Sequence, residues 1–98
     1  MPAVLELVFP DLSQEQYERL KEKVDRVNDP RDGGISHVVW WEGNHCHAID
    51  VWESQAAWEA FGAARLGPAS AELEISMDAT PIFHDPHELL IVKTLAAP

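Results

Sequence analysis

The stretch of residues 34–54, GISHVVWWEGNHCHAIDVWES, decides the fold of this chain. Two runs rich in Val, Ile, Trp and His flank the pair Gly43-Asn44, and both residues of that pair readily adopt a positive φ. Apolar and β-branched runs on either side of such a pair are typical of a tight β-hairpin. We therefore expect two antiparallel strands that meet at Gly43-Asn44.

A two-residue turn fixes which residues of the two strands oppose each other, and opposed residues share one side of a sheet. Counting outward, the predicted pairs are Glu42 with His45, Trp41 with Cys46, Trp40 with His47, Val39 with Ala48, Val38 with Ile49, and His37 with Asp50. One side of the hairpin then carries Ile35, His37, Val39, Trp41, Cys46, Ala48, Asp50 and Trp52. The other side carries Ser36, Val38, Trp40, Glu42, His45, His47, Ile49, Val51 and Glu53. Because both sides contain apolar residues, the pattern leaves open which of them faces a pocket.

The segment before the hairpin predicts a strand and a helix. Ala3–Phe9 is a short apolar run closed by Pro10, which is typical of a buried strand. Ser13 and Gln16 fit a capping box at the start of a helix. The apolar stripe of that helix is expected at Tyr17, Leu20, Val24 and Val27. The turn formers of residues 28–34 should end it.

The segment after the hairpin predicts a second helix and a final strand. Ser54 is expected to cap the helix, and residues 66–68 (Leu-Gly-Pro) to break or kink it before residues 69–75 resume for a turn or two. The inner stripe of this helix is predicted at Ala57, Trp58, Phe61, and Ala64 or Arg65. Residues 81–87 and 89–93 should form strand, interrupted at Pro86.

The predicted order is β-α-β-β-α-β in a single domain over residues 1–98. That order is typical of a ferredoxin-like α+β fold, in which a four-stranded antiparallel sheet carries helices on one face only. On the other face Val38, Trp40, Ile49 and Val51 would form an apolar strip open to water. Such a strip implies a partner, and a two-fold homodimer is the default solution.

Charge and composition exclude several kinds of partner. The formal net charge of −10, from 17 acidic and 7 basic residues, repels phosphate backbones and anionic headgroups, so we expect neither nucleic acid nor membrane as a partner. The single cysteine, Cys46, excludes an intramolecular disulfide and fits a reducing compartment. The apolar runs fall far short of the roughly 18 residues of a spanning helix, and the N-terminal segment lacks a basic signal region. These features predict a cytoplasmic protein.

Several segments resemble a known group of proteins, the dimeric α/β-barrel superfamily, and most closely its antibiotic-biosynthesis-monooxygenase-like branch. They are residues 34–37 (GISH), 47–54 (HAIDVWES), 57–61 (AWEAF), 65–68 (RLGP) and 87–89 (HEL). The resemblance spans about residues 3–93. It implies a homodimer whose two sheets pack face to face as a barrel, with a pocket between each sheet and its own helices. It also implies that the side of the hairpin with His37, Asp50 and Trp52 faces that pocket.

Members of this branch include cofactor-free oxygenases of aromatic polyketides, haem-degrading oxygenases, small isomerases and polyketide cyclases. The haem-degrading members bind iron through a histidine of the second helix. This sequence has no histidine between residues 48 and 83, and Phe61 stands where many relatives carry one. We therefore expect no haem and no other cofactor.

His37 and Asp50 form the candidate catalytic pair. A carboxylate that accepts one imidazole N–H fixes the tautomer, raises the basicity of the ring and leaves the other nitrogen free to take a substrate proton. We expect the pair to lie in a space that water barely reaches. A buried pair whose polar atoms merely satisfy each other is the structural alternative. The predicted pocket walls are Trp41, Trp52, Trp58 and Phe61, and the resemblance adds His87 as a residue that closes the pocket.

Other candidate chemistry is weaker. His45 and His47 share a side of a strand as a metal pair would, and His84 and His87 could add ligands, but no carboxylate or cysteine spacing completes a site, so we expect no metal. Cys46 has no helix N-terminus or cation nearby in the sequence that would activate its thiol.

The leading prediction is a cofactor-independent enzyme that acts on a small hydrophobic, aromatic or polyketide-like compound. Proton abstraction by the His37/Asp50 base would lead to monooxygenase, isomerase or cyclase chemistry. The alternatives are a non-catalytic dimeric module that binds or senses such a compound, and a purely structural partner. A polar pair that converges inside an apolar cavity would favour the enzyme.

Overall fold

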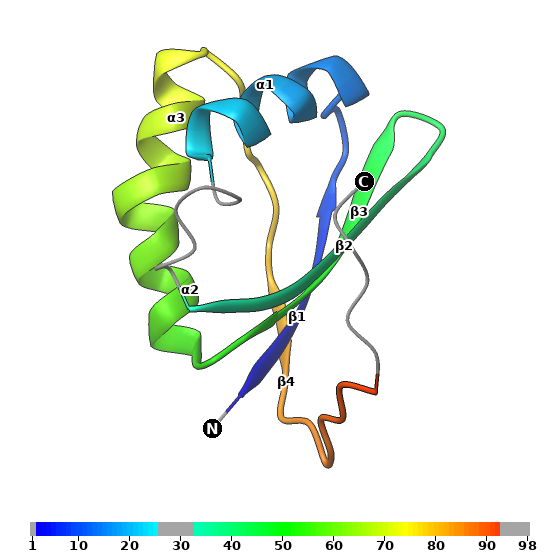
Figure 1. Ribbon diagram of the computed structural model, residues 1–98. Coiled ribbons are helices and arrows are strands. Elements are labelled where there is room, and N and C mark those ends of the chain that lie inside the picture. Colours follow the sequence, from blue (N-terminus) through cyan, green and yellow to red (C-terminus); the bar gives the residue numbers. More distant parts are fainter. Residues whose placement is uncertain (1, 26–32, 93–98) are drawn as a thin grey trace.

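A computed structural model describes residues 2–25 and 33–92 of the chain (Figure 1). The elements in order are β1 (Ala3–Phe9), α1 (Gln14–Val24), β2 (Gly34–Glu42), β3 (His45–Trp52), α2 (Gln55–Phe61), η1 (Gly62–Leu66), α3 (Gly67–Glu72) and β4 (Ile82–His84). Within these residues the strands form one antiparallel sheet of order β2-β3-β1-β4, and the helices lie on one side of it (Figure 1). The predicted ferredoxin-like α+β fold is confirmed. Predictions for Val27, residues 28–32, Lys93 and residues 95–98 lie outside the described residues.

The β2–β3 hairpin has the predicted register. The six pairs from Glu42–His45 to His37–Asp50 all form, and Gly43 takes a φ of 61° at the turn. A bulge between Gly34 and Ser36 inserts Ile35 as an extra residue, so strict alternation ends two residues before His37. The pair His37–Asp50 therefore keeps the spacing that the turn imposes.

The inner face of the sheet, beneath the helices, holds the core. Along β1, Leu5, Leu7 and Phe9 are buried on one face, as the alternation of the sequence predicts. On β3 the residues from Cys46 to Trp52 that share this face are buried as well. The side of the hairpin with His37 and Asp50 thus faces the helices, which settles the alternative that the sequence pattern left open.

Helix α1 covers one end of this face. The Ser13 hydroxyl accepts from the amide of Gln16 at 3.1 Å, and the Gln16 side chain accepts from the amide of Ser13 at 3.0 Å, so the predicted capping box is present. The buried residues of α1 are Leu20 and Val24, while Tyr17 of the same stripe is half-buried.

Residues 66–68 are predicted to break or kink the second helix, and the break is wrong, because the chain stays helical from α2 through η1 into α3. Pro68 lacks an amide hydrogen, and its ring would clash with the carbonyl four residues earlier in a regular helix. The π-helical turn η1 immediately before it widens the backbone, with the Gly67 amide donating to the Gly62 oxygen. Ala64 is exposed and Arg65 half-buried; the Arg65 guanidinium donates to the Val24 oxygen at the end of α1.

The last strand is shorter than predicted. β4 covers only Ile82–His84 and pairs with Val4–Glu6 of β1, so one further residue would bring it to the end of β1 at Ala3. Residues 89–92 are exposed and lie in no strand of the described chain, contrary to the prediction for 89–93. Pro86 and the end of β1 explain this, because a strand continues only where a neighbour offers hydrogen bonds.

The face of the sheet opposite the helices exposes apolar side chains. Val38, Trp40 and Ile49 of the predicted strip are exposed, and Val51 is half-buried. Val8 and Ile82 extend the same face onto β1 and β4. Among the described helices, none is long and apolar enough to span a bilayer.

Candidate functional site

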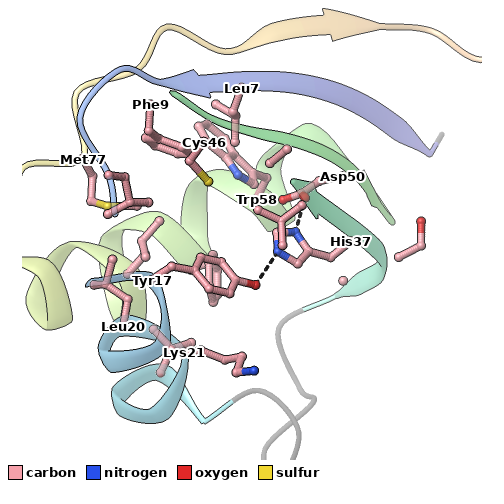
Figure 2. A pocket seen from close by; sticks show the side chains of 18 of the residues that line it. Leu7, Phe9, Tyr17, Leu20, Lys21, His37, Cys46, Asp50, Trp58 and Met77 are labelled. Atoms are coloured by element: carbon pink, nitrogen blue, oxygen red, sulfur yellow. Dashed lines mark hydrogen bonds and ion pairs between the residues drawn. The ribbon is translucent and has the colours of Figure 1, made fainter. Parts of the chain in front are cut away.

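A cavity of about 380 Å³ lies between the inner face of the sheet and the helices (Figure 2). Its volume is within the range of small-molecule sites in proteins. Most of its wall is apolar, contributed by Leu7, Phe9, Leu12, Leu20, Val24, Ile35, Val39, Cys46, Ala48, Trp58, Phe61, Leu66 and Met77. Its polar lining includes Tyr17, Lys21, Ser36, His37 and Asp50. An apolar chamber with a few convergent polar groups is the form that binding sites for small organic molecules usually take.

His37 and Asp50 meet across the hairpin at this cavity, as the register predicts. The Nδ1 of His37 lies 2.5 Å from the Oδ1 of Asp50. Because an ionised carboxylate only accepts hydrogen bonds, Nδ1 carries a proton, and when the ring is neutral Nε2 is an acceptor. The Asp50 side chain is 8% exposed, but that of His37 is 31% exposed. The expectation of a space closed to water therefore holds for the carboxylate and is wrong for the imidazole, which stands on edge strand β2.

Tyr17 completes this arrangement from the opposite wall. Its hydroxyl points at the imidazole of His37 and lies 2.9 Å from Nε2 (Figure 2). The two ring centroids are 6.1 Å apart, with an angle of 9° between the ring planes. Since Nε2 of the neutral ring has no hydrogen, the Tyr17 hydroxyl donates to it. The helical periodicity of the sequence predicts Tyr17 only as part of the apolar stripe of α1 and does not indicate its contact with His37. The available signal was the phenol itself, because a half-buried tyrosine hydroxyl needs a partner.

Two of the predicted pocket residues support the site from behind and do not line the cavity. Trp52 has no exposed surface, packs on Phe61 at 5.0 Å, and donates its indole N–H to the Oδ2 of Asp50 at 3.2 Å. Trp41 donates to the backbone oxygen of Leu12 at 2.8 Å and lies edge-on against Tyr17 at 5.5 Å. Trp52 thereby orients the carboxylate, and Trp41 orients the phenol.

Of the other predicted pocket residues, two line the cavity and one does not. Trp58 and Phe61 of α2 line the cavity. His87 is exposed and does not contribute to the lining, contrary to the prediction that it closes the pocket. The reason is the early end of β4 at His84, after which the chain leaves the sheet before it reaches His87.

The remaining histidines lie on the outer face of the sheet. His47 stacks on Trp40 at 5.3 Å and lies 3.1 Å from Glu42, and His84 lies 3.6 Å from Glu6. In the part of the chain that the structure describes, no three His, Cys, Asp or Glu residues converge as metal ligands would. Glu6 points to solvent, as its position on the strand suggests.

Cys46 is buried in the cavity wall. Burial raises the pKa of its thiol, since the thiolate would lose its hydration. The thiol therefore stays protonated near neutral pH and contributes apolar surface to the cavity.

No protein-family model matches the sequence, and no curated protein matches it. Solved structures do. A variant of SnoaB, a cofactor-independent oxygenase from Streptomyces nogalater, superposes with a TM-score of 0.64 at 16% identity, over 91% of this chain and 96% of that one. A monooxygenase from the gene ActVA-Orf6 of Streptomyces coelicolor, in complex with nanaomycin D, gives a TM-score of 0.56 at 22% identity, over 93% and 92% of the two chains.

A third similar structure is described as an antibiotic biosynthesis monooxygenase, with a TM-score of 0.57 at 13% identity over 90% of this chain and all of the other. The chain thus has the fold of the antibiotic-biosynthesis-monooxygenase-like proteins, as the resemblance of its hairpin and second helix implies. At these identities the likeness establishes the fold, and the chemistry has to be argued from the site.

Proposed function

We propose that this protein is a cofactor-independent enzyme that acts on a small hydrophobic, aromatic or polyketide-like compound. It removes a proton from an acidic C–H or O–H of that compound, and oxygenation, isomerisation or cyclisation follows. The observation that carries this proposal is the His37–Asp50 pair at the edge of a mainly apolar cavity of about 380 Å³. A structure of similar fold described as a cofactor-independent oxygenase supports the absence of a cofactor. Another, described as a monooxygenase in complex with nanaomycin D, supports the ligand class.

Each part of the site has a task in this chemistry. Asp50 is held by Trp52 on one oxygen and by His37 on the other, so the imidazole is fixed in one tautomer and orientation. When the imidazole takes up a proton, the buried carboxylate stabilises the resulting cation. The apolar walls, among them Trp58 and Phe61, hold a flat ring against this pair and exclude most water.

The protein also needs a cover for the outer face of its sheet, and we propose that a second copy provides it. Val38, Trp40 and Ile49 expose apolar surface there, and a chain of 98 residues buries only about 60–65% of its unfolded surface alone. A two-fold pairing of these faces gives the homodimer that the sequence predicts.

The enzyme proposal is tested with an anthrone such as dithranol. Its central-ring CH2, opposite the carbonyl and conjugated with it through the two arene rings, is acidic, and its oxidation by dioxygen is visible in absorbance. Binding is measured by fluorescence quenching, and turnover by dioxygen uptake above the uncatalysed rate. We expect both for the wild-type protein, and for Met77→Leu as a matched cavity variant. His37→Gln should bind the anthrone but lose turnover.

Two results would contradict the proposal. Binding without any acceleration in the wild-type protein would favour the binding or sensing module, for which the mainly apolar cavity is also suited. Equal turnover in wild type and His37→Gln would show that the imidazole is not the base.

A further inference from the structure

We propose that the Tyr17 hydroxyl is the group that takes the proton directly from the ligand, and that His37 and Asp50 act behind it as a relay. This inference rests on the proposed function and refines it. It changes which atom faces the substrate and therefore which ligands suit the cavity.

Both ring nitrogens of His37 already have hydrogen-bond partners within the protein. Nδ1 lies 2.5 Å from Asp50, and Nε2 lies 2.9 Å from the Tyr17 hydroxyl. A ligand could reach Nε2 only after the phenol had moved aside. The hydrogen-bonded order Trp52–Asp50–His37–Tyr17 instead leads from the most buried group to one on the opposite wall of the cavity.

The Tyr17 phenol is held in place by the residues around it. Trp41 lies edge-on against the Tyr17 ring at 84°, and the Trp41 indole is itself tied to the Leu12 oxygen. The imidazole lies beyond the hydroxyl end of the phenol, with the two ring planes nearly parallel. Figure 2 shows the Tyr17 and His37 side chains reaching toward each other from α1 and β2. A phenol held at its ring by Trp41 and at its hydroxyl by His37 keeps that oxygen at one point of the cavity wall.

The proton transfer balances without any added reactant. The O–H or C–H bond of the ligand breaks and its electron pair stays on the ligand, while the proton goes to the Tyr17 oxygen. The original Tyr17 proton moves to Nε2 of His37, and Asp50 stabilises the imidazolium. Tyr17 ends as a neutral phenol that donates to the new ligand anion, so it is regenerated within the same step.

This arrangement selects a ligand class. The acidic group of the ligand has to come within hydrogen-bond distance of the Tyr17 oxygen. The ligand should therefore carry a phenolic or enolic O–H, or a C–H that forms an enolate. The rest of the ligand should be an apolar ring system that fits against Trp58 and Met77. Simple hydroxyarenes are therefore sufficient probes of the site.

The test uses p-nitrophenol, whose absorbance distinguishes the phenol from the phenolate. In the wild-type protein, the pH at which half of the bound probe is ionised should lie below its value in free solution. Tyr17→Phe should raise this midpoint by about one to two pH units, the equivalent of one hydrogen bond to a charged group. His37→Gln should raise it as well, and Gln14→Ala, at the exposed start of α1 and away from the cavity, should leave it unchanged.

A second variant keeps the shape of the site. Tyr17 is the only tyrosine in the sequence, so biosynthetic incorporation of fluorotyrosine alters this phenol alone and makes it more acidic. A more acidic phenol donates more strongly to the ligand anion. The midpoint should therefore fall in the order Phe, tyrosine, fluorotyrosine, an order that a purely structural role for the ring would not produce.

The outcomes separate the two proposals. If Tyr17→Phe keeps or lowers the midpoint while His37→Gln raises it, His37 takes the proton directly, and this inference fails while the proposed function stands. If the wild-type protein does not shift the ionisation of the probe at all, the acid–base site itself fails, and both proposals are overturned.

Discussion

The indole N–H of Trp52 donates to the Oδ2 of Asp50 at 3.2 Å, from a ring that has no exposed surface. A carboxylate as buried as Asp50 needs donors on both oxygens, and Trp52 and His37 supply one each. The proposed catalytic pair is thus anchored to the hydrophobic core by a residue that does not line the cavity.

Trp52→Phe removes that donor while it keeps an aromatic ring in the core. We expect a loss of about 1–3 kcal/mol in the free energy of unfolding, because one buried carboxylate oxygen is left without its partner. Chemical denaturation measures this loss. Trp58→Phe, on the cavity wall, is the matched control and should cost less; an equal loss would mean that the bond to Asp50 contributes nothing.

Asp50→Asn keeps the shape of the carboxylate but removes its charge. The imidazolium that forms when His37 takes up a proton then loses its stabilising partner, so anthrone turnover should fall by about 10²–10⁴-fold, the usual contribution of a positioned acid–base group. Steady-state dioxygen uptake measures the effect. Turnover at the wild-type rate would show that the carboxylate is only structural.

Alanine substitutions at Gly67 and Gly62, in the same helical segment, should change the stability of the protein in opposite directions. A Cβ on Gly67 would lie 2.8 Å from the Gly62 oxygen, whereas a Cβ on Gly62 meets nothing within 4 Å. Gly67→Ala should therefore destabilise the protein by about 1–3 kcal/mol through overpacking. Gly62→Ala should stabilise it by about 0.5–1 kcal/mol, because alanine loses less backbone entropy on folding. Thermal unfolding of the two variants is the measurement, and a stabilised Gly67→Ala would contradict the π-helical turn.

Cys46 should be a slow nucleophile in the folded protein. Burial raises the pKa of its thiol above the ordinary 9.0, so iodoacetamide should react more slowly with the native chain than with the chain in urea at every pH up to that value. The folded state holds this proton to higher pH than the unfolded state. The contribution of Cys46 to stability is therefore constant below about pH 9 and is lost as the pH rises through the folded pKa. Mass spectrometry follows the alkylation, and equal native and denatured rates would show that the thiol is accessible.

Val38→Lys places a charge in the centre of the exposed apolar face. If a second copy covers this face, the dissociation constant of the dimer should rise by about tenfold or more, because an unpaired charge in an interface costs at least about 1.4 kcal/mol. Gln14→Lys, at the exposed start of α1, adds the same charge and should have no effect. Analytical ultracentrifugation measures both, and a wild-type protein that sediments as a monomer would refute the proposed homodimer.

The hairpin could be predicted to the residue because its register follows from local information. The turn at Gly43-Asn44 and the two-residue alternation of strands place His37 opposite Asp50 by counting alone. The same holds for the Ser13 cap and for the buried side of β1, each of which depends on residues close together in the sequence.

The missed features depend on contacts between distant segments. Tyr17 and His37 come from different elements, and their pairing depends on how α1 docks over the sheet, which helical periodicity does not specify. The length of the last strand depends on where β1 ends. The apolar run of residues 89–92 therefore predicts a strand that has no neighbour to pair with. The passage of the helix through Pro68 depends on a widened turn that propensities do not predict.

The most direct test of the central claim is side-chain nitrogen NMR of His37 in the ligand-free protein, assigned by comparison with His37→Gln. The measurement is made on the neutral imidazole, the form that could act as the base. The account predicts the tautomer with the proton on Nδ1, shared with Asp50, and a bare Nε2 that accepts from Tyr17. A proton on Nε2 would contradict it, because the imidazole could then take nothing from a ligand through Tyr17.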